Sequence, residues 1–366
     1  MRSPLLPIAS GAAVLAGAIA AAVAAAPSAP ANPLRVGVMA APAGATQVEI
    51  TVTNTSRKTV RVPKWQLPFA AQESQLFQVS RDGRPVPYVG RLVKRGLPSP
   101  ADFHVLGPGQ SVRVVVDLAT SYDLSQAGEY VVTYRAPLQH ASLSDGAMLR
   151  QPNGMPMEAR SVPLRLWVDA RSAQAAAAKA GGNGKRPGSG SGTVVNGVSY
   201  VNCSATQIDT AGSAVVEARR YSEDSKSYLS AGRVGSRYTT WFGAYTSARY
   251  GTVSQHFVAI DGAMDQSGGQ IKINCGCNQS YYAYVYPNRP YEIFVCRAFW
   301  SAPLTGTDSK AGTLIHEMSH FDNVANTDDI VYGQSGAKNL AASDPDGAVR
   351  NADNHEYFAE NTPPLN

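Results

Sequence analysis

The segment from residue 171 to residue 198 cannot bury a hydrophobic core of its own. Ala173 to Ala180 is mostly alanine, and Gly181 to Gly192 consists largely of glycine and serine. This composition is typical of exposed, flexible linkers. Because a chain of 366 residues is long enough for two domains, we expect residues 171–198 to be a flexible linker between them.

Residues 1–31 are expected to be a signal peptide. Arg2 precedes an apolar run that extends from Val14 to Val23, and Ala29-Pro30-Ala31 offers a cleavage site between small residues. The run is rich in alanine and weakly hydrophobic, which favours a removable signal over a membrane anchor. No later stretch is long and apolar enough to span a bilayer. We therefore expect a secreted, extracellular protein without stable membrane insertion.

Residues 32–170 contain short runs in which apolar and polar residues alternate. The clearest is Gln47 to Val52, and similar runs are Val112–Val116, Tyr130–Tyr134 and Leu164–Val168. Turn signals such as Asp82-Gly83 separate the runs. The pattern predicts an all-β antiparallel sandwich of immunoglobulin-like type.

Residues 199–366 have a different pattern. Ile208 to Ala231 shows helical spacing, and Gly333 to Ala342 suggests another helix. Ile271 to Trp300 is rich in Cys, Tyr, Val and Phe, which suggests short strands. This region is expected to be a helix-rich α+β domain.

Charge divides unevenly between the two halves of the chain. Residues 1–198 carry 20 Lys+Arg and 10 Asp+Glu, whereas residues 199–366 carry 12 and 17. The opposite net charges could attract the two regions to one another. No basic stripe or aromatic-interleaved motif accompanies the positive charge, so we expect no nucleic-acid partner.

The four cysteines, Cys203, Cys275, Cys277 and Cys296, all lie in the second half. In an exported protein they should form disulfides, and their spacing is not that of a standard zinc site. Cys275 and Cys277 are too close in sequence to bond comfortably to each other. Two pairings stay open: Cys203–Cys275 with Cys277–Cys296, or the crossed alternative.

His316 and His320 are the histidines of an H-E-x-x-H pattern that also contains Glu317. Residues four apart on a helix lie on one face, so both imidazoles can bind one zinc ion. Glu317 can reach a water at the metal without being a ligand and can act as general base. Asp308 or Ser309 is expected to cap the start of this helix.

A catalytic zinc usually has three protein ligands and one open position. No histidine follows His320 until His355, but Asp322, Asp328 and Asp329 offer carboxylates, and spacing alone does not choose among them. A structural site would normally be closed by four ligands. Only three are apparent here, which favours catalysis.

The segment from Asn326 to Gly333 resembles the G-T-x-D-x-x-Y-G signature of the aspzincin zinc metallopeptidases, the deuterolysin group. The resemblance implies that Asp329 is the third zinc ligand and that Tyr332 hydrogen-bonds the oxyanion. Asn326 stands where the family has Gly. Both residues tolerate a positive φ, so we expect the turn to survive.

Further segments resemble the peptidyl-Lys metalloendopeptidases of this group, and together the resemblance covers nearly all of residues 199–366. These segments are Tyr238–Gly243, Ala283–Arg289, Gly306–Ser309 and Asn351–Phe358. The resemblance implies the disulfides Cys203–Cys275 and Cys277–Cys296.

The same resemblance implies cleavage on the amino side of lysine. The acidic residues of the lysine pocket then correspond to Asp353 and Glu356. An ammonium that enters a partly desolvated pocket needs a paired carboxylate, so the assignment agrees with the physical chemistry.

These expectations combine into the precursor of a secreted zinc endopeptidase. The β-sandwich at residues 32–170 is the expected pro-region, and residues 199–366 are the expected zincin catalytic domain with one zinc ion. The expected partners are lysine-containing protein or peptide substrates and the chain's own pro-region. Two alternatives are an aspzincin of broader specificity and a surface-binding protein with a structural zinc site.

Two hypotheses concern maturation. Lys179 and Lys185 lie in the expected linker, so an enzyme that cuts before lysine could release its own catalytic domain there. The opposite charges suggest that the predicted β-sandwich at residues 32–170, called the front region below, docks on the catalytic domain and inhibits it. High salt should weaken that inhibition if surface charge drives the docking.

Overall fold

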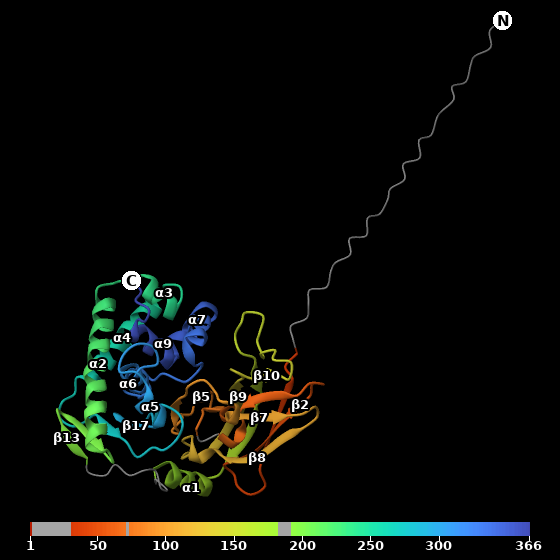
Figure 1. Cartoon of the computed structure of the whole chain (residues 1–366). Coiled ribbons are helices and arrows are strands. Elements are labelled where there is room, and N and C mark those ends of the chain that lie inside the picture. The colour runs from red at the N-terminus through yellow and green to blue at the C-terminus, as the bar shows by residue number, and fades with distance from the viewer. Residues whose placement is uncertain (2–30, 71–72, 182–191) are drawn as a thin grey trace. The chain divides into compact units, whose positions relative to one another are not determined.

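The computed structural model describes Met1 and residues 31–70, 73–181 and 192–366 (Figure 1). Ala31–Asn366 belong to a single unit. Residues 2–30 of the expected signal peptide and residues 182–191 of the expected linker, including Lys185, lie outside the described residues. In the described parts of the chain, no helix has the length and apolar character needed to cross a membrane.

The residues before the first α-helix are strand-rich, as predicted, and every strand pair within this region is antiparallel. One sheet has the order β1 (Leu34–Ala40), β2 (Gln47–Asn54), β8 (Ser111–Asp117). A second has the order β10 (Ser142–Leu143), β3 (Val60–Pro63), β7 (Phe103–Leu106). The third has the order β11 (Glu158–Arg160), β9 (Gly128–Pro137), β4 (Phe77–Arg81), β5 (Arg84–Pro85), and β12 (Leu164–Val168) also pairs with β9.

The alternating pattern that predicted β2 matches its burial. Val48, Ile50 and Val52 are fully buried, and the residues between them are partly exposed. One face of an antiparallel sheet can therefore cover the core while the other faces water. The described residues of this region also form four short 3₁₀ helices: η1 (Lys64–Gln66), η2 (Pro68–Ala70), η3 (Pro100–Asp102) and η4 (Leu118–Thr120). The immunoglobulin-like arrangement stays a prediction.

The prediction of a flexible linker over residues 171–198 is wrong for its first part and for its end. Ala170–Gly181 forms the helix α1, and Thr193–Val195 and Val198–Val201 form strands. Alanine has the highest helix propensity, and Ala173 and Ala176, one turn apart, are both buried. The alanine-rich composition therefore encodes a docked helix.

The second region combines one mixed sheet with eight helices among its described residues. The sheet order is β13 (Thr193–Val195), β14 (Val198–Val201), β15 (Lys272–Asn274), β17 (Glu292–Val295), β16 (Ala283–Val285), β6 (Leu92–Lys94). The helices are α2 (Ala205–Ser230), α3 (Ser236–Phe242), α4 (Ser247–Met264), α5 (Arg297–Ser301), α6 (Lys310–Ser319), α7 (Gly333–Ser343), α8 (Pro345–Arg350) and α9 (Ala352–Glu360). The predicted helix-rich α+β character is confirmed.

The last strand of this sheet, β6, comes from the front region. It pairs antiparallel with β16, with Lys94 opposite Ala283 and Val93 opposite Tyr284. The two regions therefore share one sheet, which the sequence patterns did not predict.

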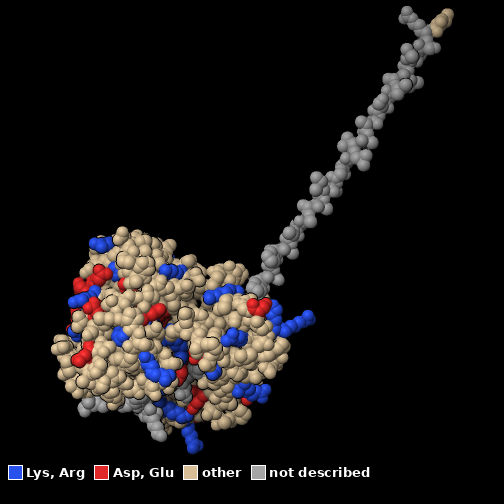
Figure 2. Space-filling model, viewed as in Figure 1, with Lys and Arg blue, Asp and Glu red and all other residues tan. Residues whose placement is uncertain are grey.

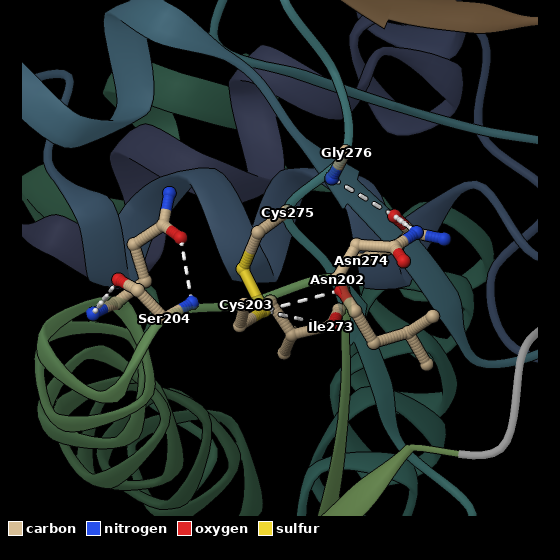
Figure 3. The surroundings of a disulfide bond; sticks show 9 residues. Asn202, Cys203, Ser204, Ile273, Asn274, Cys275 and Gly276 are labelled. Atoms are coloured by element: carbon tan, nitrogen blue, oxygen red, sulfur yellow. Dashed lines mark hydrogen bonds between the residues drawn. A yellow bond between two sulfur atoms is a disulfide. The ribbon is translucent and has the colours of Figure 1, made fainter.

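Two disulfides brace the second region, and their pairing is the one that the family resemblance implied. Cys203 bonds Cys275, and Cys277 bonds Cys296. Figure 3 shows the first of these bridges, which joins the segment before α2 to the segment after β15.

Candidate active site

Helix α6 carries the H-E-x-x-H pattern through the interior of the second region. Ser309 caps its start, because the Ser309 hydroxyl accepts a hydrogen bond from the Gly312 amide at 2.9 Å. Every residue of the helix is buried. His320 follows directly after the last helical residue and keeps helical backbone angles. The two imidazoles of His316 and His320 therefore face the same place, with ring centroids 4.8 Å apart.

Three ligand-type atoms converge beside this helix. Asp329 Oδ1 lies 3.2 Å from His316 Nε2 and 3.5 Å from His320 Nε2. All three atoms are buried and have no hydrogen-bond partner. Donor atoms placed about 2.0–2.1 Å from a tetrahedral zinc ion lie about 3.3 Å from one another. The donor set, its spacing and its unpartnered atoms all fit one zinc ion with an open fourth position.

The position of Asp329 answers a question that spacing left open. Asp329, and neither Asp322 nor Asp328, groups with both histidines among the described residues. The turn before it survives the substitution of Asn for the family's Gly, because Asn326 adopts a φ of 48°.

The other ring nitrogens of the two histidines have acceptors nearby. His320 Nδ1 lies 2.8 Å from the carbonyl oxygen of Thr327. His316 Nδ1 lies 2.8 Å from Asp353 Oδ1 and 3.2 Å from Glu356 Oε2. Contacts of this kind fix the ring orientation and leave each Nε2 free to bind a metal.

The Glu317 side chain has no hydrogen-bond partner among the described residues. Both of its carboxylate oxygens are buried without a hydrogen bond. Burial raises the pKa of Glu317 to about 7. A carboxylate in this environment can exchange a proton near neutral pH, which is what a general base or acid requires.

Asp353 and Glu356 lie on α9, and their carboxylates contact a lysine of the front region. Lys94 Nζ lies 2.5 Å from Glu356 Oε2, 3.5 Å from Asp308 Oδ1 and 3.9 Å from Asp353 Oδ1. The Lys94 side chain is 1% exposed. Burial acts to lower the pKa of Lys94, but the carboxylates outweigh burial and raise that pKa well above its usual value.

His316, Asp353 and Glu356 form a second group whose atoms lie close enough together to hold a metal ion. The ammonium of Lys94 already pairs with both carboxylates of this group. A metal ion there would have to compete with a buried cation, so the group of His316, His320 and Asp329 is the better candidate metal centre.

The backbone of β6 contacts two of the predicted site residues. Tyr332 Oη donates a hydrogen bond to the carbonyl oxygen of Val93 at 3.0 Å, and the Val93 amide donates to Asp329 Oδ2 at 2.9 Å. The Gln139 side chain bonds both the amide and the carbonyl of Tyr332, at 2.7 and 2.5 Å. The front region therefore touches the site through its backbone as well as through Lys94.

Sequence reasoning missed Val93, Lys94 and Gln139. Lys94 lies 262 residues before Glu356 in sequence, and no local pattern marks such a contact. His355 does not join the three candidate metal-binding residues: its ring nitrogens contact the Asn351 carbonyl and the ring of His256, each at 3.0 Å.

Known proteins resemble this chain over both of its regions. The family described as "Lysine-specific metallo-endopeptidase", the aspzincins, matches residues 228–360. A protein of Aeromonas hydrophila named "Extracellular protease" is 43% identical over 322 residues, which cover 87% of this chain and 89% of that protein. A "Peptidyl-Lys metalloendopeptidase" of Grifola frondosa is 36% identical over 331 residues, which cover 87% of this chain and 88% of that protein.

A solved structure titled "Zinc peptidase from Grifola frondosa" is 46% identical, covers 45% of this chain and 100% of that chain, and has a TM-score of 0.43. From the family match and the two long relatives, this chain belongs to the aspzincin family of lysine-specific metallo-endopeptidases, whose metal is zinc.

Proposed function

We propose that this protein is a secreted endopeptidase, made as a precursor, that uses one zinc ion to hydrolyse peptide bonds on the amino side of lysine. The observation that carries the lysine preference is the ammonium of Lys94 against Glu356 and near Asp353. A buried pocket that pairs a lysine side chain with two carboxylates can select lysine in a substrate. The pocket adjoins the metal centre, because His316 contacts both carboxylates.

In this proposal His316, His320 and Asp329 hold the zinc ion, which supplies a Lewis acid that activates water near neutral pH. Glu317 accepts the proton of the attacking water. Glu317 then donates this proton to the lysine nitrogen as the carbon–nitrogen bond breaks, so that a neutral amine leaves. Its unpartnered carboxylate beside the metal centre supports this role.

Tyr332 is proposed to stabilise the negative charge that develops on the carbonyl oxygen under attack. Its hydroxyl already donates a hydrogen bond to a peptide carbonyl, that of Val93. A preorganised donor at this position lowers the barrier because it needs no reorganisation during the reaction.

Four features support secretion and precursor status. Residues 1–31 have the composition of a signal peptide, and two disulfides suit an oxidising compartment. One relative is named an extracellular protease. The side chains of His316, Glu317 and His320 are fully buried, so the intact chain would have to change before a substrate could enter.

Digestion of a defined protein by the processed enzyme tests the proposal. We expect fragments that begin with lysine, found by mass spectrometry, and no fragments after zinc is removed with a chelator. Chelator-sensitive fragments with mixed first residues would support a zinc-dependent protease but contradict the proposed preference for lysine.

Substitutions in the pocket make the test sharper. Glu356→Gln should lower kcat/KM for lysine substrates about tenfold or more, because it removes the negative charge that strengthens the hydrogen bond to the lysine ammonium. Asp346→Asn is the matched control, since the side chain of Asp346 is 82% exposed. Zinc content must be measured in each variant, because Glu356 also contacts His316.

A further inference from the structure

The strand β6 pairs with the catalytic sheet as an added strand. Its three residues, Leu92–Lys94, lie antiparallel to β16 at the edge of the sheet. Extended peptides commonly bind proteins in this way, because main-chain hydrogen bonds hold any sequence and pockets select side chains. The position of β6 is therefore one that an extended substrate could take.

The register of β6 matches a cut on the amino side of lysine. The carbonyl that accepts the Tyr332 hydrogen bond belongs to Val93, and the next residue, Lys94, carries the ammonium that lies in the acidic pocket. The Val93–Lys94 peptide bond thus has the direction and register that the proposed reaction requires. A reversed strand would not bring the carbonyl before lysine to Tyr332.

The Lys94 side chain and the two pocket carboxylates have almost no solvent-exposed surface. Lys94 is 1% exposed, Asp353 2% and Glu356 0%. A second lysine could enter only if Lys94 left, because two ammonium groups in one buried site would repel each other.

Contacts outside the pocket hold β6 on both sides. Arg91 Nε donates to Tyr286 Oη at 3.1 Å, and Arg91 Nη1 lies 3.5 Å from Glu73 Oε1. Arg95 Nη2 donates to the Glu73 carbonyl at 3.0 Å. A cut between Val93 and Lys94 would leave both new ends attached, so a cut alone need not empty the site.

We propose that β6 is an internal, substrate-like inhibitor: Lys94 occupies the lysine pocket and the strand takes the place of the substrate backbone, so the intact chain cannot bind a lysine-containing peptide. The inference rests on the proposed function for the identity of the pocket. Beyond that function, it states that Lys94 occupies the pocket before maturation. It also states that β6 must leave β16 before a substrate can bind.

Peptide binding to the zinc-loaded full chain tests this inference without relying on activity. A Glu317→Gln background keeps the chain uncut, and the probe is a fluorescein-labelled peptide with one lysine, followed by fluorescence anisotropy. We expect no binding by Glu317→Gln alone. The added substitution Lys94→Ala should tighten binding about tenfold or more, because a pocket with unpaired carboxylates then becomes free. For a peptide with norleucine in place of lysine, the same substitution should increase the binding affinity much less.

Lys58→Ala is the matched control, because Lys58 is a front-region lysine with a 54% exposed side chain, paired with Asp145. A Glu317→Gln chain that also carries Lys58→Ala should exclude the peptide, as the Glu317→Gln chain alone does. Binding by the Glu317→Gln chain as tight as by the Lys94→Ala chain would overturn the inference. Exclusion by a Lys94→Ala chain that shows a cooperative thermal transition would overturn it as well.

Arg91→Ala keeps the inference testable if Lys94→Ala does not fold. Arg91 holds β6 from outside the pocket, so its loss should let the peptide compete and bind measurably more tightly. An unchanged exclusion in a folded Arg91→Ala chain would count against the inference. Failure of the proposed function is a separate result, since it would appear as cleavage by the processed enzyme without preference for lysine.

Discussion

Asp353 and Glu356 each contact both a histidine of the candidate metal centre and the ammonium of Lys94. Asp353 Oδ1 lies 2.8 Å from His316 Nδ1 and 3.9 Å from Lys94 Nζ, and Glu356 Oε2 lies 3.2 and 2.5 Å from the same two atoms. A carboxylate behind a metal-binding histidine orients the ring and raises its basicity. The proposed lysine pocket and the candidate metal centre therefore share two side chains.

The residues of the candidate metal centre could be predicted from the sequence, whereas Lys94, which occupies the proposed lysine pocket, could not. His316 and His320 follow from helical spacing, and Asp329 follows from a family signature. Lys94 reaches the pocket only because β6 joins a sheet formed by residues far along the chain. The pairing of β6 with β16 depends on tertiary structure, and the sequence pattern around Lys94 does not predict it.

Tyr332→Phe should lower kcat of the processed enzyme by about 10²- to 10³-fold, because it removes one donor to the developing oxyanion. KM and zinc content should change little, since the ring stays in place and Tyr332 is not among the three metal-binding residues. Steady-state kinetics on a lysine peptide measures the effect. Tyr245→Phe, at a residue that is 51% exposed, is the control. A rise in KM with unchanged kcat would place the Tyr332 hydroxyl in substrate binding instead.

Helices α6 and α1 show where element prediction succeeds and fails. For α6, a capping residue and an apolar run agree with the tertiary structure, and of the two expected caps, Asp308 and Ser309, the structure uses Ser309. For α1, the alanine-rich composition suits both a flexible linker and a helix. The docking of Ala173 and Ala176 decides in favour of the helix. Lys179 accordingly lies on a helix and pairs with Asp117 at 2.6 Å, which weakens the hypothesis of self-cleavage in a flexible segment there.

Ser309→Ala should destabilise the protein more than Ser204→Ala, although both serines cap helices. Ser309 is fully buried, and its hydroxyl accepts from Gly312 and donates to Glu360. Its loss removes a cap and leaves a buried carboxylate with one donor fewer, so we expect about 2 kcal/mol or more. Ser204 is exposed and caps α2 through Gln207, so its loss should cost about 1 kcal/mol.

Urea unfolding of the two serine variants measures the difference. Because α6 carries His316 and Glu317, Ser309→Ala should also weaken zinc binding, while Ser204→Ala should not. Equal destabilisation by the two substitutions would show that the bond from Ser309 to Glu360 contributes no net stability.

At the scale of the whole molecule, the front region and the catalytic region meet through a shared sheet. The contacts at the site are β6 pairing with β16, the buried Lys94 ammonium and the bonds of Gln139 to Tyr332. On the face drawn in Figure 2, Lys and Arg as well as Asp and Glu occur over both regions. The uneven total charge is therefore a weaker explanation of docking than these specific buried contacts.

Salt should have little effect on the exclusion of lysine peptides by the intact Glu317→Gln chain. Raising ionic strength from about 0.1 M to about 1 M shortens the Debye length from about 10 Å to about 3 Å and screens exposed charges, but buried pairs are screened much less. Because Lys94 and Glu356 have almost no exposed surface, anisotropy should show the same exclusion at both salt concentrations. Peptide binding that appears only at high salt would instead favour docking driven by the opposite charges of the two regions.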